Sequence, residues 1–153
     1  MSLKSEAAFT IQQAEERHAR AIQRLVLTSG INPTALDWRR FYIAITDDGE
    51  FIGCGKVKPH GDGSHELASL AVKKEWRRRG VATALMQALL SQHPQELHLM
   101  CQSSLGPLYE NFGFEVIDED EMPTYFRRVS KLASVIESLR KQGKSLLIMR
   151  RSV

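Results

Sequence analysis

The chain has 153 residues, of which 42% are hydrophobic and 25% charged, so we expect residues 1–153 to form one globular domain. No apolar run approaches the roughly 18 residues that a membrane span needs, and the N-terminal residues lack a signal-peptide core. We therefore expect a cytoplasmic protein that does not bind membranes, and its formal net charge of +3 suits an anionic ligand without indicating a nucleic-acid partner.

Hydrophobic periodicity and turn signals predict an α/β chain whose first half is antiparallel. We expect strands over residues 9–12, 38–46, 51–58, 65–72, 97–101, 114–117 and 146–149. We expect helices over residues 15–28, 80–93, 107–112 and 124–142, a short turn or helix from Asn32, and Gly143 as the cap of the last helix. The helix between the fourth and fifth strands should make that pair of strands parallel.

The stretch between residues 70 and 89 carries the clearest functional signal. The apolar strand ends at Val72, a cationic turn spans Lys73–Arg79, and Gly80 precedes a helix with a single apolar face. The first turn of a helix leaves about four backbone N–H groups unpaired and carries roughly half a positive charge. Because glycine has no Cβ, a bulky anion can approach this backbone closely. The stretch therefore predicts a binding site for a pyrophosphate, although a run of three arginines is also compatible with a solvated turn.

Two motifs resemble those of the GNAT superfamily of acyl-CoA-dependent N-acetyltransferases. Arg77–Ala82 matches the Arg/Gln-x-x-Gly-x-Gly/Ala signature, and its position between a strand and an amphipathic helix makes the match more specific. Tyr109–Phe114 supplies a second match at the spacing that the family shows. The resemblance covers roughly residues 66–114.

The resemblance implies a GNAT-like fold, a mixed and mostly antiparallel twisted sheet of about seven strands flanked by helices. It implies acetyl-CoA as cosubstrate, whose pantetheine arm would lie between the fourth and fifth strands, and no metal. The cosubstrate-binding residues that it implies are Leu70, Ala71, Val72, Arg77, Arg78, Arg79, Gly80, Val81, Ala82 and Thr83. The chain departs from the family in having Gln102 where many members have asparagine, and in the helix inserted before the last strand.

Acyl transfer to an amine needs a base for the ammonium group and an acid for the leaving thiolate. By resemblance, Tyr109 is the acid and Glu66 the base, with a backbone N–H near Val72 as the oxyanion donor. A free glutamate has a pKa of about 4.3, so Glu66 would have to be partly buried or act through water. The alternatives are a packing tyrosine and a solvated carboxylate at the strand edge.

The resemblance predicts an enzyme that transfers an acetyl group directly from acetyl-CoA to a primary amine of a small molecule or a protein. A non-catalytic acyl-CoA-binding module is the alternative. Cys54 and Cys101 lack metal-ligand spacing and are expected to be buried free thiols, and His60 and Asp62 with His65 are too few for a metal site. The acceptor is not specified by the sequence.

The inserted helix over residues 124–142 lies on the acceptor side in the resembled fold. Helical spacing of four and three residues separates its apolar residues, which are Tyr125, Val129, Leu132, Ile136 and Leu139. An apolar strip left exposed on this helix would favour a homodimer.

Overall fold

The computed structural model describes residues 8–31, 36–140 and 145–153. The strands are β1 (Phe9–Gln13), β2 (Phe41–Thr46), β3 (Phe51–Pro59), β4 (His65–Val72), β5 (Leu97–Gln102), β6 (Glu115–Val116) and β7 (Leu146–Arg151). The helices are α1 (Ala19–Thr28), α2 (Val81–Gln92), α3 (Gly106–Glu110) and α4 (Thr124–Arg140), with 3₁₀ turns at Glu16–His18, Trp38–Arg40, Lys74–Trp76, Ser103–Leu105 and Glu119–Glu121. The predicted turn from Asn32 and the predicted cap at Gly143 lie outside the described residues.

Within these ranges, seven strands form one sheet in the order β1-β2-β3-β4-β5-β7-β6. The β4–β5 pair is parallel, with Glu66 opposite His98, as the intervening helix predicts. The β1–β2, β2–β3, β5–β7 and β6–β7 pairs are antiparallel, which confirms a mostly antiparallel sheet flanked by helices.

The chain divides into two compact units, and the prediction of a single domain stays a prediction. The first unit comprises the residues up to Val57 together with Ala68–His93, and the second comprises Lys58–Leu67 and Pro94–Val153. Strands β3 and β4 contribute residues to both.

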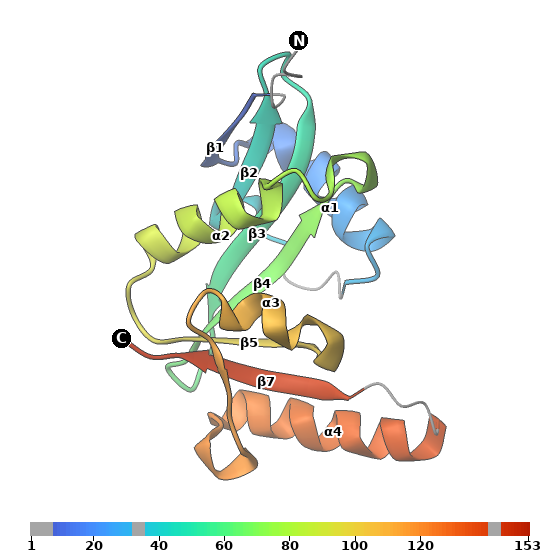
Figure 1. Cartoon of the computed structure of the whole chain (residues 1–153), viewed down its shortest axis with the longest axis vertical. Coiled ribbons are helices and arrows are strands. Elements are labelled where there is room, and N and C mark those ends of the chain that lie inside the picture. The colour runs from blue at the N-terminus through green and yellow to red at the C-terminus, as the bar shows by residue number, and fades with distance from the viewer. Residues whose placement is uncertain (1–7, 32–35, 141–144) are drawn as a thin grey trace. The chain divides into compact units, whose positions relative to one another are not determined.

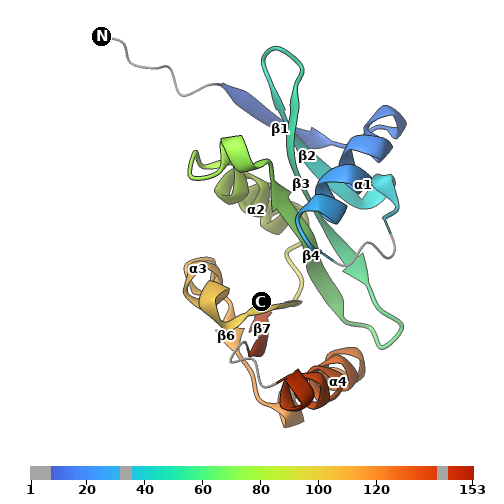
Figure 2. The same ribbon diagram turned by 90° about the vertical axis from the view of Figure 1, so that its right-hand side faces the viewer.

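In the first unit, α1 and α2 lie on opposite sides of β2 and β3 (Figure 2). The α1 side buries Ile22, Leu25 and Val26 of the helix, as predicted. On the α2 side, a Cβ at Gly53 would lie 3.2 Å from side-chain carbons of both Val81 and Leu85. This glycine therefore lets the helix pack directly on the strand.

In the second unit, α4 runs beside β7 (Figure 1). On α4, Phe126 is fully buried, whereas the side chains of Leu132 and Ile136 are 62% and 40% exposed. Phe126 packs in a core cluster with Ile117 and Ile148. The homodimer stays a prediction.

The predicted start of the second strand was wrong. The strand predicted from Trp38 begins at Phe41, since Trp38–Arg40 forms a 3₁₀ turn. The Asp37 carboxylate accepts the Arg39 N–H at 3.1 Å and so stabilises this turn at its first residue.

Candidate active site

The cationic turn of the first unit is attached to the end of β4. Arg77 Nε donates to the Val72 carbonyl at 3.2 Å, and the Trp76 N–H donates to the Lys73 carbonyl at 2.8 Å. These bonds close the turn tightly, so the chain passes from the strand to α2 within eight residues, numbers 73–80. The guanidinium groups of the turn are exposed, and that of Arg79 lies 5.1 Å from the centre of the Trp76 ring.

Two residues of this turn have a left-handed backbone. Arg78 has φ 63° and Gly80 has φ 83°. A left-handed conformation costs a residue with a side chain about 1–2 kcal/mol. Glycine at position 80 therefore avoids this cost, in addition to allowing the close approach of an anion that the sequence predicts. A Cβ at Gly80 would meet no atom within 4 Å, which means that the space in front of this backbone is open.

The N-terminus of α2 follows directly. The Ala84 N–H donates to the Gly80 carbonyl at 3.0 Å, which is the first bond of the helix. The N–H groups of Val81, Ala82 and Thr83 have no acceptor within the helix, and the helix dipole places partial positive charge there. Amide hydrogens, dipole and exposed guanidinium groups together suit an anion with several oxygens.

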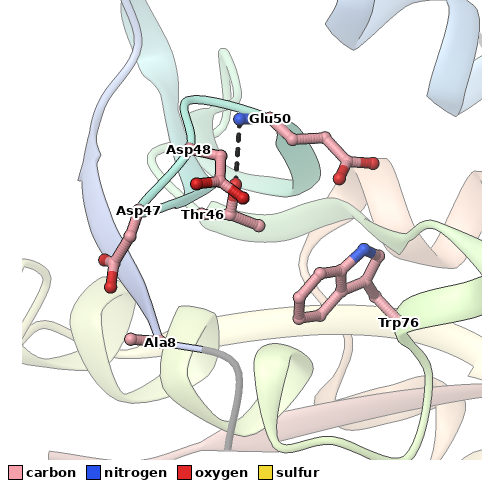
Figure 3. Close-up of a pocket in the computed structure, with 6 residues that line it drawn as sticks. All are labelled: Ala8, Thr46, Asp47, Asp48, Glu50 and Trp76. Carbon is pink, nitrogen blue, oxygen red and sulfur yellow. Dashed lines mark hydrogen bonds between the residues drawn. The ribbon is translucent and has the colours of Figure 1, made fainter.

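The first unit also contains a pocket at the β2–β3 hairpin, of about 310 Å³ (Figure 3). Three carboxylates line it, those of Asp47, Asp48 and Glu50, and the Trp76 indole faces it. Because carboxylates repel phosphate oxygens, this pocket does not suit a nucleotide diphosphate.

In the second unit, the predicted base Glu66 is a buried residue of β4. Its side chain is 8% exposed, and its Oε1 lies 2.7 Å from Nε2 of His60, which is 9% exposed. The alternative of a solvated carboxylate at the strand edge is therefore wrong. His60 is a partner that the sequence interpretation missed, although a hairpin between residues 59 and 65 was a signal from which the contact could be found.

The predicted acid Tyr109 lies in α3, where its ring meets the Phe114 ring edge-to-face at 6.3 Å. Burial, and then the charge of Cys101, raises the pKa of Tyr109 to about 12. The phenol thus keeps its proton at neutral pH and is available as a hydrogen-bond donor. The structure brings Glu66 together with His60, whereas Tyr109 packs against Phe114.

Neither cysteine has the environment of a nucleophile. Burial raises the pKa of the Cys54 thiol to about 12, and its Sγ donates to the Ser69 carbonyl at 3.6 Å. Burial also raises the pKa of Cys101, whose Sγ lies 3.9 Å from Met149 Sδ. Since the thiolate is the reactive form, both thiols are expected to be inert, and the prediction of buried free thiols is confirmed.

Residues 8–31, 36–140 and 145–153 contain no group of three or more His, Cys, Asp or Glu side chains placed to hold a metal ion. Asp62 accepts hydrogen bonds from the Ser64 hydroxyl at 2.6 Å and from the Tyr125 N–H at 2.9 Å, and these bonds lower the pKa of Asp62 to about 2. Among the helices of the described residues, none has the length and apolar composition needed to cross a membrane.

Comparison with known proteins places the chain in a family. The model of the acetyltransferase (GNAT) domain matches residues 37–116. No curated protein matches the sequence.

Several solved structures are similar to this chain. N-acetylglutamate synthase from Neisseria gonorrhoeae, complexed with coenzyme A and N-acetyl-glutamate, aligns with a TM-score of 0.72 at 21% identity, over 95% of this chain and 35% of the synthase chain. Rv2747 from Mycobacterium tuberculosis, in complex with CoA and NLQ, aligns with a TM-score of 0.73 at 17% identity, over 94% of this chain and 99% of the other. Ard1 from Thermoplasma volcanium aligns with a TM-score of 0.68 at 17% identity, over 95% and 98%.

At these identities the similarities establish the fold, and this chain spans only about a third of the Neisseria synthase chain. The family match covers more than half of the sequence and includes the strand–turn–helix at residues 70–89. The chain belongs to the GNAT acetyltransferase family.

Proposed function

We propose that this protein transfers an acetyl group from acetyl-CoA directly to a primary amine. The observation that carries the proposal is the turn from Arg77 to Gly80, which leads through left-handed residues to the N-terminus of α2. Two of the similar structures were solved with coenzyme A, which supports the same cosubstrate here.

The diphosphate of acetyl-CoA binds the backbone of residues 78–83, and the three guanidinium groups of the turn add charge around it. The pantetheine arm pairs with the backbone of Leu70 and Val72 in β4. The Lys73 N–H is already used, since it donates to the Ile52 carbonyl at 2.8 Å. The Val72 N–H is therefore the proposed oxyanion donor, a role typically worth about 3 kcal/mol.

The reaction begins with loss of one proton from the acceptor ammonium group to Glu66, through a water molecule. The neutral nitrogen attacks the thioester carbonyl carbon and gives a tetrahedral oxyanion. The oxyanion collapses, the C–S bond breaks, and the amide and the CoA thiolate form. The remaining excess proton on the amine nitrogen leaves as the amide forms, and the thiol of free CoA regains a proton.

Tyr109 assists the departure of the thiolate mainly by donating a hydrogen bond. A typical thiol has a pKa of about 8.5, so complete proton transfer from a phenol whose pKa is about 12 is uphill by about 5 kcal/mol. A hydrogen bond to the developing thiolate needs no such transfer. The proton that finally resides on CoA then comes from the amine or from water, with Tyr109 retaining its own.

The test is calorimetric titration with acetyl-CoA, followed by thiol release with a panel of amines. The panel holds L-glutamate, because a similar structure is an N-acetylglutamate synthase, and other amino acids, polyamines, aminoglycosides and peptides with lysine or free N-termini. Transfer predicts thiol release that depends on one acceptor class. Binding without thiol release from any amine would favour a non-catalytic acyl-CoA-binding module, and no binding would refute the proposal.

A further inference from the structure

The carboxylate of Glu66 has a single well-defined partner in the second unit. The 2.7 Å contact with Nε2 of His60 joins two side chains that are both more than nine-tenths buried. An ionised carboxylate can only accept hydrogen bonds, so in that state Nε2 carries the hydrogen and donates to Glu66 Oε1. The bond fixes one carboxylate oxygen of Glu66.

The backbone of the β3–β4 hairpin explains why these two side chains meet. The His60 N–H donates to the Ser64 carbonyl at 2.8 Å, so residues 60 and 64 lie opposite each other. Glu66 is two residues beyond Ser64 and is thus the diagonal neighbour of His60 on the same face. The His60–Glu66 contact therefore follows from the register of the β3–β4 hairpin.

The inserted helix α4 holds the other side of His60. The Tyr125 ring stacks on the His60 ring with centroids 3.7 Å apart and planes 18° apart, and the Phe126 ring meets the same imidazole edge-to-face at 5.6 Å. Asp62, in the hairpin turn, accepts the Tyr125 N–H at 2.9 Å and so fixes the first turn of α4 to the same hairpin. Phe126 also stacks on His98, the residue opposite Glu66 on β5, at 5.2 Å.

The imidazole is therefore held from two directions, by the carboxylate at its edge and by an aromatic ring on its face. Such a ring can rotate little, and it transmits this constraint to the carboxylate. Burial, and then the charge of Glu66, raises the pKa of Tyr125, as expected for a phenol close to that carboxylate.

We infer that His60 is a positioning residue for the base Glu66, and that Tyr125 of the inserted helix holds His60 in place. This inference rests on the proposed function, because it assigns a role within the acetyl transfer. It gives α4 a part in catalysis that is separate from any part in choosing the acceptor.

The test compares two pairs of variants in steady-state transfer assays. H60A is expected to lower kcat at least about tenfold while leaving KM for acetyl-CoA unchanged, and H60Q is expected to restore most of the loss, since its amide can donate to Glu66. Y125A is expected to lower kcat, whereas Y125F keeps the stacked ring and should resemble the wild type. L132A, at an exposed position of the same helix, is the control and is expected to leave kcat unchanged.

Several outcomes would overturn the inference. Full kcat in H60A would remove the role of His60, and equal loss in H60A and H60Q would make the imidazole a proton carrier instead. Equal loss in Y125F and Y125A would assign the effect to the hydroxyl group. A loss in L132A as large as that in Y125A would mean that any change in α4 disturbs the site.

A measurement without turnover separates this inference from the proposed function. Long-range ¹H–¹⁵N spectra of the imidazoles should show His60 with its hydrogen on Nε2, and E66Q should move that signal. An unmoved signal would overturn the inference even in an active enzyme. A wild-type chain that shows the contact but transfers to no amine would overturn the proposed function, and the catalytic role of His60 with it.

Discussion

The turn requires a left-handed backbone at residue 80, and the proposed diphosphate site requires open space in front of it. Replacement of Gly80 by alanine tests both requirements. The left-handed backbone, with φ 83°, should cost an alanine about 1–2 kcal/mol of folding free energy. Gly49 in the β2–β3 hairpin offers a matched control, because its φ is 88° and a Cβ there would also meet nothing within 4 Å. G80A and G49A should therefore lose similar stability, with Tm lower by about 2–8 °C.

Only G80A should also lose affinity for acetyl-CoA. The added methyl group stands in the open space in front of the helix N-terminus, where the diphosphate has to approach the amides. Loss of one hydrogen bond to a charged group costs about 1.5–3 kcal/mol, which corresponds to about 10- to 150-fold in Kd. Calorimetric titration of both variants checks this, at a temperature well below their Tm. Equally tight binding of acetyl-CoA by G80A and G49A would refute this role of Gly80.

Three further experiments test Tyr109, the two cysteines and Asp62. Y109F should lower kcat by about 10²-fold at unchanged KM for acetyl-CoA, and Y42F on β2 is the control. A titration followed at 295 nm should show one tyrosine that ionises near pH 12 in the wild type and is missing in Y109F. Because burial raises the pKa of both Cys54 and Cys101, the native protein should react slowly with a disulfide reagent, whereas both thiols should react at once in denaturant. Rapid reaction of the native protein with loss of acetyl transfer would show that a thiol takes part in the reaction. The pKa of Asp62 in the folded state, about 2, lies below its ordinary value of 3.8, so the stability that its carboxylate adds is present above about pH 4 and is lost as the pH falls toward 2. The difference in Tm between the wild type and D62N should therefore shrink between about pH 4 and pH 2. A constant difference would disprove this link between the charge of Asp62 and stability.

The parts of this protein that the sequence could predict are those set by neighbouring residues. A strand ending at Val72, a cationic turn and Gly80 before an apolar-faced helix define the proposed cosubstrate segment without reference to the rest of the chain. The left-handed backbone at Arg78 was not predictable, because arginine has no preference for it and only the closed turn imposes it.

The remaining features depend on residues distant in the chain. Phe126 of α4 is buried in a cluster with Ile148 of β7, and the four-and-three spacing of the other apolar residues of α4 gives no signal for this contact. The environment of Glu66 depends on hairpin register and on a helix more than fifty residues further along the chain. The predicted hairpin was a signal for the His60–Glu66 contact, but no local residue pattern indicates that Tyr125 stacks on His60.

We expect the backbone amides at the start of α2 to bind the diphosphate of acetyl-CoA. Titration of ¹⁵N-labelled protein with CoA, followed by ¹H–¹⁵N correlation spectra, tests it residue by residue. The largest shifts are expected at the amides of residues 78–83, and these shifts should be weaker in G80A. Saturable binding that leaves these amides unmoved, or the absence of any shift, would contradict it.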